Sequence, residues 1–135
     1  MSRRVFVTGG SGHVGANLIR ALLARGDRVR ALVRKESSRE ALAGLDVELV
    51  VGDVLDPASL AELARGCDGG YHAAAMVQTV RGREQLLYRT NVLGTRQVLA
   101  AARAAGVGRV VVTSSLGAVG QPAGAPCTEA DAFNP

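Results

Sequence analysis

Short runs of apolar residues, rich in valine, recur along the chain and are separated by longer stretches of mixed polarity. Each run is too short for a helix and ends in polar or small residues, which is typical of strands. The predicted strands cover residues 5–7, 29–33, 47–51, 71–75 and 107–113. The chain is therefore expected to form a sheet, and the next question is whether the stretches between the runs are helical.

Apolar residues return at helical spacing between these runs. Val14, Leu18 and Leu22 predict a first helix with one buried face. Asp56 can cap a helix that begins at Pro57, where proline in the first turn costs no hydrogen bond. The other predicted helices are a short one at residues 39–43 and a long amphipathic one at residues 84–105, with Leu86, Val92, Val98 and Leu99 among its buried positions.

Strands that alternate with helices indicate a parallel sheet with right-handed crossovers. The sequence therefore predicts an α/β protein: a Rossmann-type doubly wound parallel sheet with helices on both faces, in a single domain over residues 1–135. After residue 113 the chain is rich in glycine and proline, which predicts a loop without a regular element.

Composition narrows the class of protein. Hydrophobic residues make up 47% of the chain and aromatic residues 3%, which predicts a core of alanine, valine and leucine. No apolar run approaches the roughly 18 residues of a membrane span, and no secretory signal precedes the first strand, so we expect a cytoplasmic protein without membrane contact. Cys67 and Cys127 lack the spacing of a metal site and are too few for a disulfide framework, so we expect no metal.

The net charge of +4 comes almost wholly from arginine, because Lys35 is the only lysine. The arginines are spread from Arg3 to Arg109 and alternate with apolar helix positions, so most are expected on solvated helix faces. Nucleic-acid binding would need clustered arginines and aromatic side chains for stacking, and we expect no nucleic-acid partner. A basic balance does favour an anionic cofactor.

Residues 8–15 read TGGSGHVG and lie between the first predicted strand and the first predicted helix. Gly9, Gly12 and Gly15 have the spacing of a phosphate-binding turn, and a strand–turn–helix is the setting that this motif requires. Gly9 permits the tight turn, Gly12 lets backbone approach a pyrophosphate, and Gly15 lets the helix pack against the strand. A plain glycine-rich turn is the alternative.

The amides of Ser11, His13 and Val14 are expected at the N-terminus of the first helix, where the helix dipole favours phosphate. The ring of His13 is expected to pack over the turn rather than to act in catalysis. His72 lies within a predicted strand and is expected to be a structural histidine with satisfied hydrogen bonds. Neither histidine is therefore a candidate for the chemical step.

Three motifs in this order resemble the extended short-chain dehydrogenase/reductase family: TGGSGHVG at residues 8–15, GDV at residues 52–54 and TSSLGAVG at residues 113–120. That family includes nucleotide-sugar epimerases and dehydratases, dihydroflavonol-reductase-like enzymes and 3β-hydroxysteroid dehydrogenases. The resemblance covers residues 4–135. It implies a dinucleotide-binding domain of an enzyme that moves hydride to or from a carbonyl or secondary alcohol, with the C-terminal part of the family fold missing.

The end of the second predicted strand indicates which dinucleotide is bound. NAD-binding units place an acidic residue there to accept a hydrogen bond from the ribose 2′-OH, whereas this chain has Val33 followed by Arg34 and Lys35. A guanidinium can grip a 2′-phosphate, and the strand resembles the dihydroflavonol-reductase-like branch, whose matching arginine binds NADP. We therefore predict NADP, with NAD as the alternative if Glu36 takes the ribose.

The resemblance implies roles for further residues. Asp53 is expected to bond the adenine amino group, with the amide of Val54 on the ring. Asn91, within TNVLGT, matches an asparagine that braces the active site, and Ser115 matches the residue that hydrogen-bonds the reacting oxygen of the substrate. The other residues expected at the cofactor are Thr8, Ala73, Ala74, Ala75, Thr113 and Ser114, of which the alanines are small enough to lie against the nicotinamide ribose.

The family's proton donor is the tyrosine of a Tyr-x-x-x-Lys pair. Tyr71 and Tyr88 are followed at that spacing by Ala75 and Val92, so this chain lacks the pair and is expected to be inactive by itself. The leading interpretation is the cofactor-binding part of an NADP-dependent oxidoreductase acting on a small carbonyl or alcohol. A nucleotide-sugar epimerase or dehydratase and a non-catalytic NAD(P)-binding sensor are the alternatives. An exposed edge on the fifth strand also predicts self-association.

Overall fold

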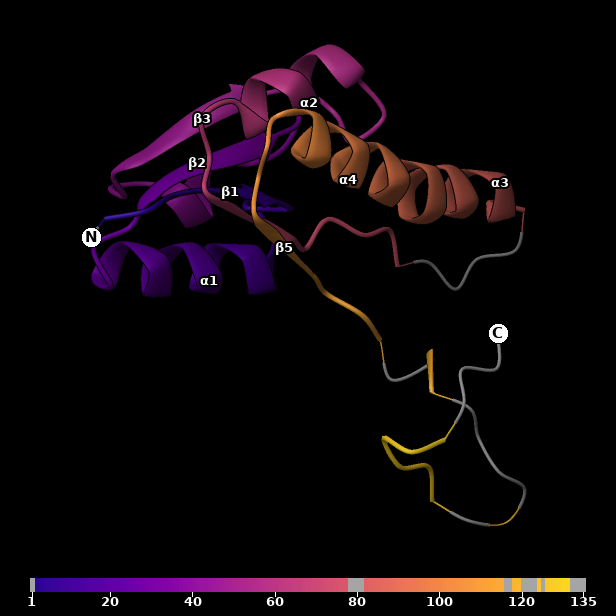
Figure 1. The fold of residues 1–135 in the computed structure, drawn as a ribbon. Coiled ribbons are helices and arrows are strands. Elements are labelled where there is room, and N and C mark those ends of the chain that lie inside the picture. The colour runs from indigo at the N-terminus through magenta and orange to yellow at the C-terminus, as the bar shows by residue number, and fades with distance from the viewer. Residues whose placement is uncertain (1, 78–81, 116–117, 120–123, 125, 132–135) are drawn as a thin grey trace.

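The computed structural model describes residues 2–77, 82–115, 118–119, 124 and 126–131. A parallel sheet of five strands in the order β3-β2-β1-β4-β5 runs through the described part (Figure 1). The strands are β1 Arg4–Thr8, β2 Arg28–Val33, β3 Val47–Val51, β4 Gly69–His72 and β5 Arg109–Val112. The strand order reverses at β1, and such a switch point leaves a crevice at the carboxyl ends of the strands.

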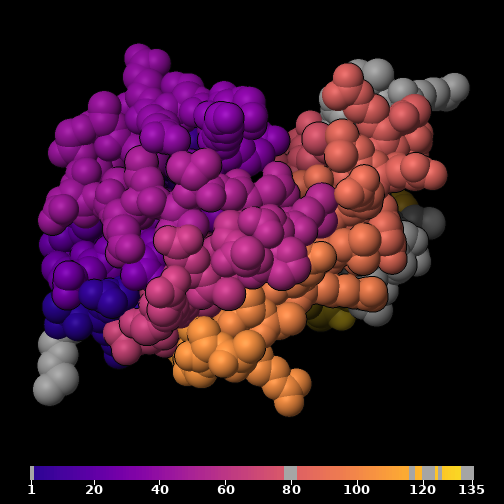
Figure 2. All heavy atoms as spheres, turned by 90° about the horizontal axis from the view of Figure 1, so that it is seen from above, coloured from indigo at the N-terminus to yellow at the C-terminus, as the bar shows by residue number. Residues whose placement is uncertain are grey.

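Helices cover both faces of the sheet. The helix α1 His13–Ala24 and the 3-10 turn η1 Glu40–Leu42 lie on one face, and α2 Pro57–Ala64 and α4 Gly94–Ala104 lie on the other. Figure 1 shows α1 on the opposite side of the strands from α2 and α4, and Figure 2 shows α2 alongside α4. The predicted doubly wound parallel sheet with helices on both faces is confirmed.

A separate apolar layer fills each side of the sheet. Val7 of β1 points toward α1 and packs with Ile19 in one layer. Phe6 points the opposite way and packs with Leu60 in the other. Gly70 of β4 lies beside Phe6, and a Cβ at Gly70 would overlap the phenyl ring. Since β1 is buried on both faces, the turn that follows it is held on a rigid strand.

The fourth strand differs from its prediction at residues 71–75. β4 covers Gly69–His72 and pairs with β1 along its whole length. Two glycines open the strand because pairing with β1 outweighs their low strand propensity. The amide of Ala73 still donates to the carbonyl oxygen of Thr8 at 3.2 Å, and the chain then leaves the sheet. The predicted fifth strand, at residues 107–113, is shorter at both ends and covers Arg109–Val112.

The long helix predicted at residues 84–105 is divided into three parts. It consists of α3 Glu84–Tyr88, a π turn at Arg89–Leu93 (η2) and then α4. A π turn holds an extra residue per turn and so rotates the faces of the segments that it joins. The short helix predicted at residues 39–43 is only the 3-10 turn η1. None of the helices in the described ranges is long and apolar enough to cross a membrane.

Several buried positions predicted for the helices are exposed. Val14 is 56% exposed, whereas the buried residues of α1 are Gly15, Ala16, Ile19 and the predicted Leu22. Beyond the π turn, Val98 is 1% exposed as predicted, whereas Leu99 is 40% exposed. In α3, Leu86 is 39% exposed, and Val92 within the π turn is half-buried.

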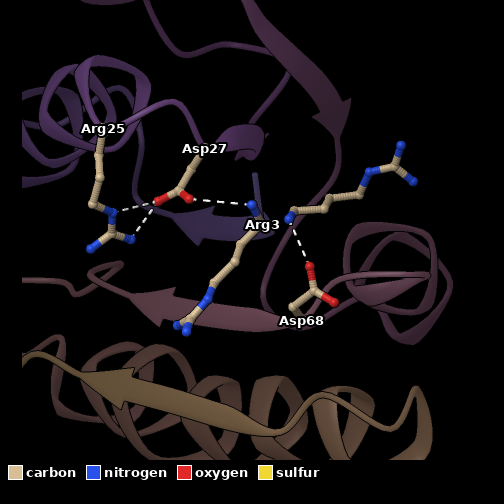
Figure 3. Close-up of polar contacts among 5 residues, drawn as sticks. Arg3, Arg25, Asp27 and Asp68 are labelled. Atoms are coloured by element: carbon tan, nitrogen blue, oxygen red, sulfur yellow. Dashed lines mark hydrogen bonds and ion pairs between the residues drawn. The ribbon is translucent and has the colours of Figure 1, made fainter. Parts of the chain in front are cut away.

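Two aspartates form hydrogen bonds at the amino ends of the strands (Figure 3). Asp27 accepts a hydrogen bond from the amide of Arg3 at 3.4 Å and forms an ion pair with Arg25. Asp68 accepts from the amide of Arg4 at 2.8 Å. Burial alone would raise the pKa of Asp27, but the hydrogen bonds from Arg25 and Arg3 outweigh burial and lower that pKa. This edge is thereby held in register, at the opposite end of the strands from the crevice.

Candidate functional site

The glycine-rich turn joins the carboxyl end of β1 to the start of α1. Gly9 has a φ of 72°, which glycine adopts at no steric cost. A Cβ at Gly9 would lie 2.7 Å from the backbone of Ala73. Its carbonyl oxygen accepts from the amide of Gly12 at 3.0 Å, and a Cβ at Gly15 would overlap that same oxygen. Glycine at these positions lets the helix begin directly over the turn.

The N-terminus of α1 has no side-chain cap. Gly12 is the N-cap residue, and the first turn of the helix contains no acidic residue. The amides at this end and the helix dipole therefore favour an anion. His13 and Val14 are exposed at the start of the helix, and the exposure of His13 is consistent with a ring that lies outside the packed core.

A cavity of about 400 Å³ opens beside this turn, within the size range of small-molecule sites. Its walls come from the segments that follow β1, β2, β3 and β4 and from the π turn. Of the residues predicted for the cofactor, it is lined by Gly9, Gly12, Arg34, Asp53, Val54, Ala73, Ala74 and Ala75. The structure therefore gathers most of the predicted residues around one space.

Other lining residues were not singled out as side chains that face a ligand. They are Ser11, Leu32, Ser37, Met76, Val77 and Thr90. Met76 and Val77 extend the alanine run, and Thr90 directly precedes Asn91, so their neighbours in the sequence are a signal that could have found them. Ser37 follows Arg34 through a turn that local sequence does not specify.

Arg34 is the first residue after β2 and lines the cavity. The amide of Ser37 donates to the carbonyl oxygen of Arg34 at 3.1 Å, and this turn brings Ser37 to the same wall. Lys35 and Glu36 are exposed and do not line the cavity. Since β2 ends at Val33, Glu36 is the third residue after the strand.

Asp53 lies in the loop between β3 and α2, and local hydrogen bonds hold it there. Its Oδ1 accepts from the amide of Leu55 at 2.9 Å, and its own amide donates to the hydroxyl of Ser59 at 3.3 Å. A Cβ at Gly52 would overlap the side chain of Ser59, so glycine lets the loop lie close to α2. Asp53 and Val54 both line the cavity.

Asn91 lies in the π turn and reaches across to the segment after β4. Its Oδ1 accepts from the amide of Met76 at 2.7 Å, and its Nδ2 donates to the carbonyl oxygen of Met76 at 2.9 Å. Asn91 does not itself line the cavity, whereas Met76 and Thr90 do. Its side chain therefore braces the cavity wall from behind, and its predicted part in catalysis stays a prediction.

Thr8 and His72 are buried and do not line the cavity. The hydroxyl of Thr8 and Nδ1 of His72 are 2.6 Å apart, and Nε2 of His72 lies 2.9 Å from the hydroxyl of Thr95. Burial lowers the pKa of His72. The prediction of a structural histidine with satisfied hydrogen bonds is confirmed.

Thr113, Ser114 and Ser115 follow β5 and are exposed. The amide of Thr113 donates to the carbonyl oxygen of His72 at 2.9 Å, which continues the pairing of β5 with β4. The carbonyl oxygen of Ser115 accepts from the amide of Ala118 at 2.9 Å. None of these three residues lines the cavity, and their roles at the cofactor and the substrate stay predictions. The rest of TSSLGAVG falls partly outside the described residues.

The sequence profile of the NAD dependent epimerase/dehydratase family matches residues 5–135. The chain belongs to this family. Its place there agrees with the resemblance that the glycine turn, GDV and TSSLGAVG carry, and with the cavity at the switch point. Solved structures that this chain resembles include proteins with bound NAD.

Three proteins illustrate the family relationship. The chain is 52% identical over 120 residues to sterol demethylase protein B of Methylococcus capsulatus, covering 88% of this chain and 37% of that protein. It is 50% identical over 115 residues to a putative dihydroflavonol 4-reductase of Synechocystis, covering 85% of this chain and 33% of that protein. A short-chain dehydrogenase/reductase superfamily protein from Agrobacterium tumefaciens with bound NAD superposes with a TM-score of 0.83 at 32% identity, covering 98% of this chain and 39% of that one.

The chain spans about a third of the length of the curated relatives that it matches. The matched part is the one that forms the sheet and the cavity. Neither Tyr71 nor Tyr88 is followed by a lysine four residues later, so neither forms a Tyr-x-x-x-Lys pair. The described residues therefore form the cavity at the switch point of the sheet without a Tyr-x-x-x-Lys pair.

Proposed function

We propose that this chain is the NADP-binding part of an NADP-dependent oxidoreductase that transfers hydride to or from a carbonyl or secondary alcohol. The observation that carries the proposal is the position of Arg34. It lies directly after β2 and lines the same cavity as Gly12 and Asp53. No acidic residue occupies the end of β2, where an NAD-binding unit would need one.

The charge of Arg34 favours NADP over NAD. A 2′-phosphate is an anion with several acceptor oxygens, and a guanidinium can bind it through charge-assisted, bidentate hydrogen bonds. A carboxylate at the same position would repel the phosphate. Ser37 lines the same wall and adds a hydroxyl donor beside the arginine.

The other walls of the cavity fit the rest of a dinucleotide. The uncapped start of α1 favours the pyrophosphate, and Gly9 and Gly12 leave the backbone open to it. Asp53 and Val54 line the wall expected to hold adenine, and the alanines of residues 73–75 line the wall expected to hold the nicotinamide ribose. Bound NADPH would supply the hydride. In this proposal Ser115 orients the reacting oxygen and Asn91 braces the site.

An epimerase or dehydratase is the second candidate, because the family profile covers these activities. Both classes share the cofactor cavity, so the walls described above do not separate them. A non-catalytic NAD(P)-binding sensor is the third candidate, because the chain lacks the Tyr-x-x-x-Lys pair. Net consumption of NADPH as a carbonyl compound is reduced would favour the oxidoreductase over both, because an epimerase or dehydratase uses hydride transfer only transiently.

Titration of the purified chain with NADP and with NAD, by calorimetry at fixed salt, tests the nucleotide half of the proposal. We expect NADP to bind more tightly than NAD. Arg34→Ala should lower the affinity for NADP by about tenfold to a hundredfold, which corresponds to the loss of a hydrogen bond to a charged group. Affinity for NAD should hardly change. Arg39→Ala removes an equal charge from an exposed position on the same connection and serves as the control. Equal affinities for both dinucleotides, unchanged in Arg34→Ala, would overturn the proposal.

A further inference from the structure

His72 is held between two threonine hydroxyls in the middle of the molecule. It lies at the end of β4, is 3% exposed, and faces the helices α2 and α4. Thr8 of β1 lies 2.6 Å from its Nδ1, and Thr95 of α4 lies 2.9 Å from its Nε2. The imidazole therefore links two strands to a helix.

The neighbouring hydrogen bonds decide the direction of this link. The hydroxyl of Thr95 donates its one proton to the carbonyl oxygen of Asn91 at 2.6 Å, so toward His72 it can only accept. Nε2 of His72 must then carry the hydrogen. A neutral imidazole has one N–H, so Nδ1 accepts from the hydroxyl of Thr8. The oxygen of Thr8 in turn accepts from the amide of Ala74 at 3.2 Å.

The result is one directional series of hydrogen bonds, with one end at the cavity wall and the other end linked to that wall by the side chain of Asn91. The series starts at the amide of Ala74, which lines the cavity, and ends at the carbonyl of Asn91 in the π turn. The side chain of Asn91 makes two hydrogen bonds to the backbone of Met76, which also lines the cavity. Each group in this series of hydrogen bonds donates to the next group, so the position of one hydrogen sets the positions of the others.

We infer that His72 and Thr95 are positioning residues of the cavity, which hold the wall at Ala74 and Met76 through this chain of hydrogen bonds. Neither side chain lines the cavity, so both act through others. The inference rests on the proposed function where the ligand is concerned. The wall that it concerns follows β4, whereas Arg34 follows β2 on the opposite side of β1, so the two ends of a bound dinucleotide should respond separately.

Paired substitutions at Thr95 test the inference. Thr95→Val keeps the shape and removes the hydroxyl, while Thr95→Ser keeps the hydroxyl. Each is titrated with NADP and with adenosine 2′,5′-bisphosphate, which lacks the nicotinamide half. We expect Thr95→Val to lower the affinity for NADP by about threefold to tenfold, which corresponds to one hydrogen bond. The affinity for the bisphosphate should not change. Thr95→Ser should bind both as the unaltered chain does.

Equal weakening of both ligands in Thr95→Val, with a lower melting temperature, would overturn the inference in favour of a general structural role. Unchanged binding of both would also overturn it. If the unaltered chain binds neither ligand, the proposed function fails instead, and a second measurement still decides the inference without a ligand.

That measurement is nuclear magnetic resonance of the unliganded chain. The ring nitrogens of His72 should show the Nε2–H tautomer alone. An Nδ1–H tautomer would contradict the direction inferred for the hydrogen bonds from Thr8 through His72 to Thr95. The amide of Met76, bonded to Asn91, should exchange with solvent faster in Thr95→Val than in Thr95→Ser. The amide of Val7, in the core of β1, should exchange equally in both. Equal exchange at Met76 would show that its wall does not depend on Thr95.

Discussion

Gly15 leaves no room for a side chain where α1 passes over the turn. A Cβ at this position would overlap the carbonyl oxygen of Gly9, which already accepts a hydrogen bond from Gly12. The obstructing atom belongs to the backbone of the turn, in which Gly9 has a φ of 72°. The crowding therefore cannot be relieved by rotating a side chain.

We expect Gly15→Ala to destabilise the chain by about 1–3 kcal/mol, the usual cost of overpacking, and to weaken NADP, because the turn must shift to admit the methyl group. Urea denaturation and calorimetric titration measure the two effects. Gly108→Ala is the matched control, because its Cβ would lie at an ordinary 3.6 Å from the carbonyl oxygen of Asp68. Equal stabilities of the two variants would contradict the role assigned to the turn.

The buried imidazole of His72 makes stability depend on pH. Burial lowers its pKa in the folded chain, while an unfolded histidine takes up a proton near pH 6.5. The unfolded state therefore binds more protons as the pH falls below about 6.5, and the free energy of unfolding should fall by up to about 1.4 kcal/mol per pH unit until the folded pKa is reached.

Urea denaturation between pH 7.5 and pH 5 measures this dependence. The carboxylates contribute a background slope, because the pKa values of Asp27, Asp56 and Glu84 are also lowered in the folded chain. His72→Gln keeps that background and removes the titrating ring, so its slope should be smaller over this range. An identical slope in both proteins would mean that His72 takes up its proton equally in both states.

The helix α2 is capped at both ends by side chains. The carboxylate of Asp56 accepts from the amides of Ala58 and Ser59 at 3.1 and 3.2 Å at the N-terminus. At the C-terminus, Nη1 of Arg30 donates to the carbonyl oxygens of Glu62, Leu63 and Arg65 at 2.8, 3.2 and 2.8 Å. The cap at Asp56 was predicted, whereas Arg30 is an exception to the expectation of solvated arginines.

Arg30 lies within β2 and is 9% exposed, with its Nε 3.0 Å from the carboxylate of Glu48. We expect Arg30→Met to keep the apolar stem and to destabilise the chain by about 2–3 kcal/mol, because one buried and two part-buried carbonyl groups lose a charged partner. Arg28→Met, at the exposed start of the same strand, should change stability by less than about 0.5 kcal/mol. Thermal and urea denaturation measure the stability of both variants, and equal effects of the two substitutions would contradict the capping role.

The junction of α3 and α4 shows how one turn can redirect a helix. The π turn at Arg89–Leu93 places Thr90 on the cavity and Asn91 against Met76. Gly94 then lets α4 lie close to the loop that contains Asp53 and Val54, because a Cβ at Gly94 would lie 2.7 Å from Cγ2 of Val54. One helical segment thus contacts both ends of the cavity.

At the scale of the whole molecule, the described sheet ends in β3 on one side and β5 on the other. Val111 of β5 pairs in register with Tyr71 and lies on the same face as α1, but no helix in the described part covers it. Val111 is 49% exposed and Val112 40% exposed. An apolar edge strand with free backbone groups favours pairing with another copy.

We therefore predict self-association through β5, with Val111→Lys shifting the chain toward the monomer because a charge opposes edge pairing. Light scattering over a wide concentration range measures this. Val51→Lys places the same charge on the other edge strand, where Val51 is 51% exposed, and should have less effect. A monomer at all concentrations, or an effect of Val51→Lys alone, would contradict the prediction.

The sequence by itself determined the alternation of strands and helices, the glycine turn, the cap at Asp56 and the arginine that follows β2. Each of these depends on residues a few positions apart: the length of an apolar run, the freedom of φ at Gly9, or a carboxylate within reach of the next two amides. Local physics of this kind does not change when the rest of the chain folds around it, which is why these features could be predicted.

Only the tertiary structure decided where β4 ends, where the π turn falls and which side chains line the cavity. These features depend on pairs that are distant in the sequence, such as Thr8 with His72, Asn91 with Met76, and Arg30 with the carbonyl of Leu63. Such pairs form when strands align and helices pack on them. No local pattern around Arg30 marks it as a helix cap, because its partners are set by the position of α2 on the sheet.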